Sequence, residues 1–229
     1  MLSACMIVRD EERYLGACLR SLRDVADEVV IVDTGSVDRS VEIARDHGAT
    51  VHVRRWEEDF SYHRNQSLDL AHGDWALVID GDEELLEPAD LRALVERMPV
   101  DGIAVQVDCR TDTATVSTQS IRVFRREVGW YFYPVHNQLV GIGSWTSSPA
   151  RILAHYEGGD RGDRRAKTER TKRMLLRLAA QRPSCPHAPY HLVRHYHAEG
   201  RDADADAWAR RWSAITGRPA EIPAKSDRA

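Results

Sequence analysis

The sequence predicts an α/β protein built around a mostly parallel sheet. Apolar runs at residues 2–8, 28–32 and 75–79 each end abruptly in polar or acidic residues. Runs of this length, closed by turn residues, are typical of strands buried on both faces of a parallel sheet. Helical patterns lie between these runs, so that strand and helix alternate. This alternation predicts parallel strands joined by right-handed crossovers.

Length and composition bound the class of protein. The 229 residues allow one sizeable α/β domain with a small appendage. The formal net charge is -4 and 42% of the residues are hydrophobic, which is ordinary for a soluble protein and gives no basic excess for nucleic acid. The N-terminus lacks a basic region and no stretch approaches the roughly 20 apolar residues of a membrane span, so we expect neither a signal peptide nor a transmembrane segment. Four scattered cysteines predict reduced thiols and a cytoplasmic location.

The elements are expected in three groups along the chain. The first group has strands at 2–8, 28–32, 49–53 and 75–79, with helices at about 13–25, 38–48 and 62–72. The second has a helix at 88–98 and strands at 102–109, 120–125, 135–142 and 150–156, which indicates an antiparallel patch. The third has helices at 165–181, 190–199 and 202–215. We therefore predict an α/β domain over residues 1–159, a helical appendage over 160–217 and a loose tail over 218–229.

The strongest candidate site follows the run at 75–79. Asp80 and Asp82, separated by one glycine, come where the carboxyl end of a buried strand is expected, and open α/β sheets bind ligands at such ends. Two carboxylates at this spacing can hold a hard divalent cation, which commonly meets phosphate oxygens. Alternatively, these acidic residues form a solvated turn or an acidic cluster at a helix N-terminus. We expect Glu83 and Glu84 to have this non-functional role.

Other candidates are ambiguous by themselves. Asp33 ends the second strand and can accept a hydrogen bond from a base or a ribose, or cap the next helix. Arg64 suits bidentate contact with a diphosphate, and Arg9 has a similar ambiguity, although each can also be a solvated arginine. His155 can ligate a Mn²⁺-like ion or be structural. Aromatic residues before His136 can stack on a ligand or fill a core.

Three segments then resemble family 2 glycosyltransferases, especially the bacterial branch with peptide S-glycosyltransferases and enzymes carrying tetratricopeptide-like helices. The segments are LSACMIVRDEERYLGACLRSL, DEVVIVDTGSVDRSVEIA and RRWEEDFSYHRNQSLDLAHGDWALVIDGDEEL. They contain the ordered motifs DTGS–D, W–DF–RN and DxDE, and the resemblance continues more sparsely to about residue 159. It implies a GT-A fold, a Rossmann-like mixed sheet sandwiched by helices, that binds a nucleotide sugar with Mn²⁺ or Mg²⁺.

The resemblance also implies residue roles on the donor side. Val8, Arg9 and Glu11 would line the base pocket, Asp33 would bind the uracil or its ribose, and Arg64 would reach the nucleotide.

The DxD motif gives the metal side of the same expectation. Asp80 and Gly81 would contact the nucleotide, and Asp82 would be the more direct metal ligand. His155 matches a histidine that completes metal or diphosphate binding in many relatives of the family.

The acceptor side departs from the family. Many relatives have His-Glu where this chain has His136-Asn137, and asparagine cannot act as a general base. We expect Trp130, Tyr133 and Asn137 on the acceptor side, with His136 or Asp108 as the base. Asp112 as the base, a thiol acceptor that needs less help, and loss of activity remain open alternatives.

The sequence therefore predicts a metal-dependent inverting glycosyltransferase. It would move a sugar from a UDP-sugar to a hydroxyl or thiol of a peptide, saccharide or small molecule. The alternative is a non-catalytic nucleotide-sugar or glycan-binding module that acts through a partner. A homodimer through the C-terminal helices is also expected. A nucleotidyltransferase is disfavoured because residues 9–12 are not the Gly-rich phosphate loop that follows the first strand in such enzymes.

Overall fold

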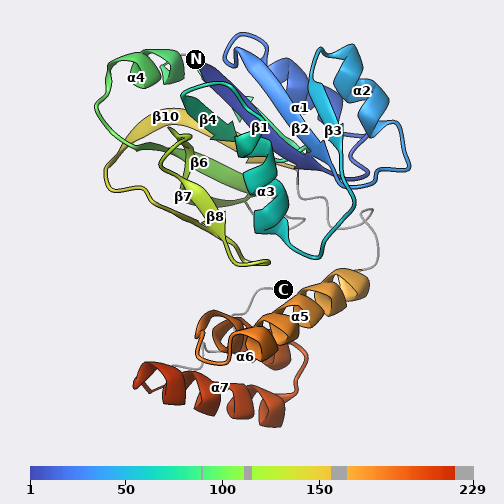
Figure 1. The fold of residues 1–229 in the computed structure, drawn as a ribbon, viewed down its shortest axis with the longest axis vertical. Helices are drawn as coiled ribbons and strands as arrows, with labels where there is room; N and C mark the ends of the chain where they lie inside the picture. Colours follow the sequence, from blue (N-terminus) through green and yellow to red (C-terminus); the bar gives the residue numbers. More distant parts are fainter. Residues whose placement is uncertain (89, 111–114, 156–163, 220–229) are drawn as a thin grey trace. The chain divides into compact units, whose positions relative to one another are not determined.

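A computed structural model of the chain describes residues 1–88, 90–110, 115–155 and 164–219. The chain divides into two compact units, Met1–Asp160 and Arg161–Ala229. Figure 1 shows the first as a layered α/β structure and the second as a group of helices. Most of the expected tail, and the base candidate Asp112, lie outside the described residues.

A mixed sheet forms the centre of the first unit. The described strands of this sheet are, in spatial order, β3 (Thr50–Val53), β2 (Glu28–Asp33), β1 (Leu2–Val8), β4 (Trp75–Val78), β7 (Thr115–Arg125), β6 (Gly102–Arg110), β10 (Trp145–Ala154) and β5 (Glu83–Leu86). The strands β3, β2, β1 and β4 are parallel, as their continuous apolar runs predict. Strand β7 is antiparallel to both of its neighbours, and β5 is antiparallel to β10. The expected α/β class and mixed sheet are confirmed.

Helices cover the two faces of this sheet. One face packs on α1 (Leu15–Leu22), α2 (Ser40–Asp46) and α4 (Leu91–Arg97). The other face packs on α3 (Phe60–Asp69) and on a hairpin of β8 (Trp130–Phe132) and β9 (Gln138–Val140). Asp59 caps α3, since its carboxylate accepts a hydrogen bond from the backbone N–H of Tyr62.

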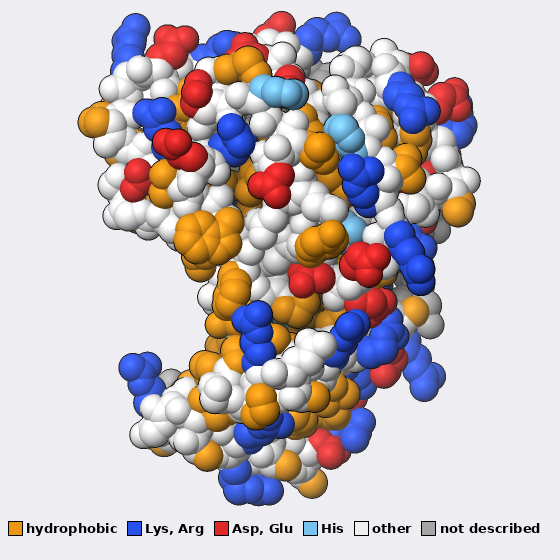
Figure 2. Space-filling view, in the orientation of Figure 1, with side chains coloured by type: hydrophobic (Ala, Val, Ile, Leu, Met, Phe, Trp, Pro, Cys, Tyr) orange, Lys and Arg blue, Asp and Glu red, His pale blue; other side chains and the backbone are white. Residues whose placement is uncertain are grey.

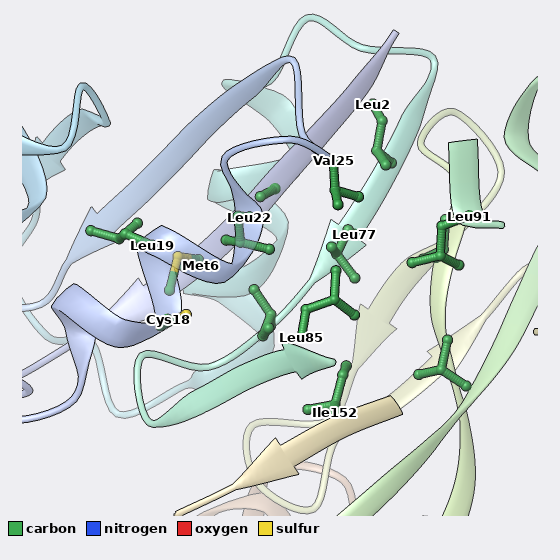
Figure 3. Close-up of a cluster of buried hydrophobic side chains, with 14 of the residues drawn as sticks. Leu2, Met6, Cys18, Leu19, Leu22, Val25, Leu77, Leu85, Leu91 and Ile152 are labelled. Carbon is green, nitrogen blue, oxygen red and sulfur yellow. The ribbon is translucent and has the colours of Figure 1, made fainter. Parts of the chain in front are cut away.

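The larger core cluster joins the parallel and antiparallel parts of the sheet. Figure 3 shows Leu22 of α1, Leu77 of β4, Leu85 of β5 and Ile152 of β10 within one cluster. Each of these side chains is almost completely buried. Burying such a side chain is worth about 1.5–3 kcal/mol, so this cluster fixes β5 and β10 beside the first half of the sheet.

The second unit consists of three described helices, α5 (Arg164–Gln181), α6 (His187–Ala198) and α7 (Asp202–Thr216). Arg211 of α7 donates to the backbone carbonyl of Ala179 in α5 at 2.8 Å, so a cation lies at the end of that helix. Buried Lys172 of α5 forms an ion pair with Glu199 at 2.7 Å. These contacts hold the helices together. No helix in the described part of the chain is long and apolar enough to cross a membrane.

Two expectations about local structure were wrong. The acidic run after Asp82 is not a solvated turn, because Glu83 is buried at the start of β5. The strand expected over 135–142 is only β9, and Tyr133 and His136 before it have positive φ angles of 74° and 49°. These angles break the extended conformation and form a loop.

Candidate functional site

The site begins where the strand order reverses. Chain order within the sheet runs β3, β2, β1 and then β4, so a crevice is expected beyond the carboxyl ends of β1 and β4. A Cβ added at Gly81 would lie 3.2 Å from Cγ of Glu11 and 3.5 Å from Cγ2 of Val8. The turn after β4 therefore lies directly against the loop after β1. Three of the expected nucleotide-side residues are brought together here.

The loop after β1 is fixed by the loop after β2. The backbone N–H of Asp10 donates to Oγ of Ser36 at 3.0 Å, and the N–H of Glu11 donates to Oγ of Ser40 at 2.7 Å. In return, the Asp10 carboxylate accepts from the N–H of Val37 at 2.8 Å. Arg9 is exposed and lies 3.7 Å from Asp10. The two loops thus form one hydrogen-bonded rim.

Asp33 shapes its own turn. One carboxylate oxygen accepts from the N–H groups of Gly35 at 3.0 Å and Ser36 at 3.1 Å, and the other accepts from the Ser36 hydroxyl. Gly35 has a φ of 104°, which a side chain would disfavour. The turn role that the sequence left open is therefore observed. The role of Asp33 in nucleotide binding stays a prediction.

Arg64 and Asp80 form the central ion pair of the site. Nη2 of Arg64, on α3, lies 2.8 Å from Oδ1 of Asp80, and the two side chains are 14% and 34% exposed. Nε and Nη1 of Arg64 are buried and have no hydrogen-bond partner among the residues that the structure describes. The guanidinium also lies 5.5 Å from the ring centre of Tyr131. Burial raises the pKa of Asp80, but Arg64 and then Arg122 outweigh it and hold that pKa below its usual value.

A second ion pair supports the turn and was missed from the sequence. Nη2 of Arg122, on β7, lies 2.8 Å from Oε1 of Glu83, and Nη1 lies 3.2 Å from Oε2. Oε2 of Glu83 also accepts from the backbone N–H of Asp80 at 2.9 Å. Burial raises the pKa of Glu83 to about 7, the Asp80 carboxylate acts in the same direction, and Arg122 opposes both.

Asp82 and His155 lie side by side through the backbone. The N–H of His155 donates to the carbonyl of Asp82 at 2.9 Å, next to the β5–β10 pairing. Nε2 of His155 is paired with a Glu84 carboxylate oxygen, and its ring stacks on Tyr14 with centroids 5.2 Å apart. Within the described ranges, no three His, Cys, Asp or Glu side chains group to hold a metal. Asp82 and His155 are therefore adjacent residues, not a complete metal cage.

The β8–β9 hairpin and its loop attach to α3 near Arg64. Asn65 clamps the Tyr131 backbone, donating to its carbonyl at 2.9 Å and accepting from its N–H at 2.8 Å. Ser61 donates to the Tyr133 carbonyl, and the N–H of Phe60 donates to Pro134 at 2.8 Å. The N-terminus of a crossover helix lies at the carboxyl edge of a parallel sheet, so this loop lies at the same edge as Asp80.

The expected acceptor-side residues follow this attachment. Trp130 is 51% exposed, His136 is exposed, and Tyr133 and Asn137 are half-buried. Hydrophobic side chains at the surface of the first unit are visible in Figure 2. The hairpin thus presents aromatic and polar groups outwards and buries Tyr131.

Asp108 has the surroundings of a structural carboxylate. It is buried on β6 and accepts from the Ser117 hydroxyl at 2.6 Å, from Gln106 at 2.8 Å and from Nε of Arg151 at 2.9 Å. Hydrogen bonds from Ser117, Gln106 and Arg151 lower the pKa of Asp108 to about 2. A carboxylate with so low a pKa is a weak base, so the geometry does not favour Asp108 for catalysis.

Comparison with known proteins identifies the family. A family model described as Glycosyl transferase family 2 matches residues 3–149. The chain belongs to glycosyltransferase family 2. It is 34% identical over 196 residues to a TPR repeat-containing protein of Synechococcus elongatus, covering 80% of this chain and 49% of that protein. It is also 33% identical over 79 residues to the glycosyltransferase SunS of Bacillus subtilis, covering 34% of this chain and 19% of SunS. The chain spans about half the length of the first relative and less of the second.

Solved structures confirm the GT-A fold of this family 2 member. Residues 1–349 of S. aureus TarS superpose with a TM-score of 0.56 at 14% identity, covering 95% of this chain and 92% of that one. Glucosyl-3-phosphoglycerate synthase from Mycobacterium tuberculosis superposes with a TM-score of 0.53 at 15% identity, covering 78% of each chain. At these identities the similarity concerns the fold alone.

Proposed function

We propose that this family 2 protein transfers a sugar from a UDP-sugar to a hydroxyl or thiol acceptor, with inversion and with Mn²⁺ or Mg²⁺. Among the proteins of the same fold, TarS has been crystallised with UDP-GlcNAc, and glucosyl-3-phosphoglycerate synthase with Mn²⁺ and UDP-glucose. These ligands support the choice of donor. The family, the reversal of strand order at β1 and β4 and the charged groups around Asp80 support the reaction class.

One observation carries the proposal: within the described part of the chain, two nitrogens of the buried Arg64 guanidinium have no hydrogen-bond partner, at the carboxyl edge of the sheet. Buried donors are nearly always paired in proteins, and unpaired ones call for an explanation. Oxygens of a diphosphate are strong acceptors that match the planar fork of an arginine. We therefore assign Arg64 to the donor diphosphate, with Asp80 holding its third nitrogen in place.

The residues of the adjoining turn fit a divalent cation. Asp82 offers a carboxylate, and His155 can offer its imidazole once it leaves Glu84. Mg²⁺ is commonly held by one or two protein carboxylates together with substrate phosphates, and imidazole suits Mn²⁺. The absence of a three-ligand group within the described residues is therefore consistent with a site that the donor diphosphate completes. The cation would offset the negative charge that develops on the departing UDP.

The rim around the turn would hold the nucleoside. Val8 and Glu11 lie against Gly81, and Arg9 between them in sequence is exposed. Asp33 is the last residue of the neighbouring strand β2. Side chains from three loops would thus orient the uridine. This orientation would place the sugar towards the loop that carries His136.

On the acceptor side, we favour His136 as the general base. It lies on the loop attached to the N-terminus of α3, and the lowered pKa of Asp108 makes that carboxylate a weak base. The imidazole would take the proton from the acceptor hydroxyl as the sugar is transferred. A thiol acceptor would need less help, since thiolate forms readily. Trp130, Tyr133 and Asn137 would contact a peptide, saccharide or smaller acceptor.

The test is calorimetric titration of the protein with UDP in the presence of Mn²⁺, followed by assays for hydrolysis of UDP-sugars. We expect binding, and we expect Asp82→Ala to weaken it at least tenfold, as loss of a metal ligand should. The matched control is Asp74→Ala. Asp74 is exposed at the other end of β4, where it pairs with the N-terminal amine at 3.2 Å.

The outcomes separate the candidate functions. No UDP binding, or equal binding by the Asp82 variant, would refute the proposal. Binding without hydrolysis or transfer for any UDP-sugar and acceptor would instead favour the non-catalytic nucleotide-sugar-binding module.

A further inference from the structure

The Asp80–Asp82 turn is held by groups from elements that are distant in sequence. The backbone N–H of Asp80 donates to the Glu83 carboxylate. The carbonyl of Asp80 accepts from the Cys18 thiol at 3.5 Å and from the N–H of Glu83 at 3.0 Å. The carbonyl of Asp82 accepts from the N–H of His155. The Glu83 side chain is the member of this set that is itself held by an ion pair, so its orientation bears on where the Asp80 backbone lies.

Arg122 determines the orientation of that carboxylate. Glu83 is 5% exposed and Arg122 is 16% exposed, and both guanidinium end nitrogens meet the two carboxylate oxygens. Nη1 of Arg122 also lies 3.4 Å from the carbonyl of Val78, the last residue of β4. A two-pronged arginine–carboxylate contact fixes direction as well as distance. The guanidinium thus links the end of β4 to the first residue of β5.

We propose that Arg122 is a positioning residue for the donor site, acting through Glu83 to hold the Asp80–Gly81–Asp82 turn in the geometry that binds metal and diphosphate. This inference rests on the proposed function for its ligand. Arg122 itself does not need to touch the donor, because both of its end nitrogens are engaged by Glu83. Groups that orient metal ligands from behind typically change metal affinity by about 10–100-fold when they are removed.

The experiment must separate positioning from simple stabilisation. Arg122→Met leaves a buried carboxylate without its cation, which costs stability by itself. The double variant Arg122→Met/Glu83→Met replaces the whole pair by apolar side chains, and such replacements are often neutral or stabilising. It restores the packing but gives the N–H of Asp80 no carboxylate. Arg126→Met is the matched control, because Nε of Arg126 donates to the Gly73 carbonyl at 2.7 Å, at the opposite end of β4.

Three measurements are made on the full chain: the thermal unfolding midpoint, the affinity for UDP with Mn²⁺ by calorimetry, and hydrogen exchange of the peptide that covers residues 78–84. We expect the Arg122 variant and the double variant both to bind UDP about 10–100-fold more weakly, with faster exchange at the turn. The double variant should recover most of the unfolding midpoint without recovering affinity. The Arg126 control should keep both the wild-type affinity and the slow exchange at the turn.

Each other outcome counts against a specific step. Recovery of wild-type UDP affinity by the double variant, or an equal loss in the Arg126 control, would overturn the positioning role and leave a structural one. Unchanged exchange at the turn would overturn it as well. If the wild type does not bind UDP, the proposed function fails, while the exchange measurement still decides whether Arg122 orders the turn.

Discussion

Replacing Arg64 by methionine tests the residue on which the proposed function depends. Methionine fills much of the space of the arginine stem but removes the pair with Asp80 and the two nitrogens that have no partner in the structure. Asp80 is 34% exposed, so water can solvate its carboxylate after the change. We therefore expect a folded variant that has lost its contact with the diphosphate.

The magnitude follows from the two unpaired nitrogens of Arg64. A hydrogen bond to a charged group is worth about 1.5–3 kcal/mol, so two such bonds to the diphosphate are worth about 3–6 kcal/mol. This loss corresponds to an increase of about 100- to 20,000-fold in the Kd for UDP. Arg64→Lys should recover only part of it, because an ammonium group restores the charge but not the planar fork.

Calorimetry with UDP and Mn²⁺ measures the effect, and thermal unfolding checks that the variants fold. The matched control is Arg92→Met, which removes an arginine–aspartate contact of 2.7 Å with Asp27, the residue before β2 at the opposite edge of the sheet. The control should bind UDP as the wild type does. A Kd for Arg64→Met within threefold of the wild-type value would refute the assignment of Arg64 to the diphosphate.

Three further predictions concern the same unit. Gly81→Ala should weaken UDP binding, measured by calorimetry, and cost about 1 kcal/mol of stability by urea unfolding, because its Cβ would lie 3.2 Å from Cγ of Glu11, which must shift; unchanged affinity would contradict the placing of the nucleotide against Gly81. Asn65→Ala should cost at least about 2 kcal/mol and lower the Tm, since both backbone groups of Tyr131 lose their partner; a variant as stable as the wild type would exclude the clamp. The pKa of Asp108 is lowered to about 2, so the stability that it contributes is complete above about pH 4 and is lost as the pH falls towards 2. The stability advantage of the wild type over Asp108→Asn should therefore shrink between pH 5 and pH 2.5, and a constant difference would argue against it.

The parallel half of the fold could be predicted because its strands are locally encoded. Strands β1, β2 and β4 are buried on both faces, so each appears in the sequence as a continuous apolar run. Strand β5 could not be found in this way, since it begins with two glutamates and lies at the sheet edge. Its buried first residue, Glu83, pairs with Arg122, 39 residues further along the chain. No local pattern indicates such a partner.

In the candidate site too, the features set by neighbouring residues could be predicted, and those set by residues distant in sequence could not. The positions of Asp80 and Gly81 at a strand end followed from the run before them, whereas the close approach of Gly81 to Glu11 is visible only in the structure. The role of Asp33 could not be decided from spacing, because turn formation and ligand binding require the same residue type at the same place. Asp108 was chosen as a base for its residue type alone, whereas its three hydrogen-bonding neighbours come from β6, β7 and β10.

The balance of charge at the turn links the two arginines to the proposed need for a metal. Arg64 faces the Asp80 carboxylate and Arg122 faces that of Glu83, so each carboxylate offsets part of the positive charge of its arginine. Such pairs orient groups well but leave little net positive charge for a diphosphate. Asp82 adds a further negative charge beside them. In the proposed site an additional cation would therefore favour binding of a diphosphate, and we assign directionality to the arginines and charge neutralisation to Mn²⁺ or Mg²⁺.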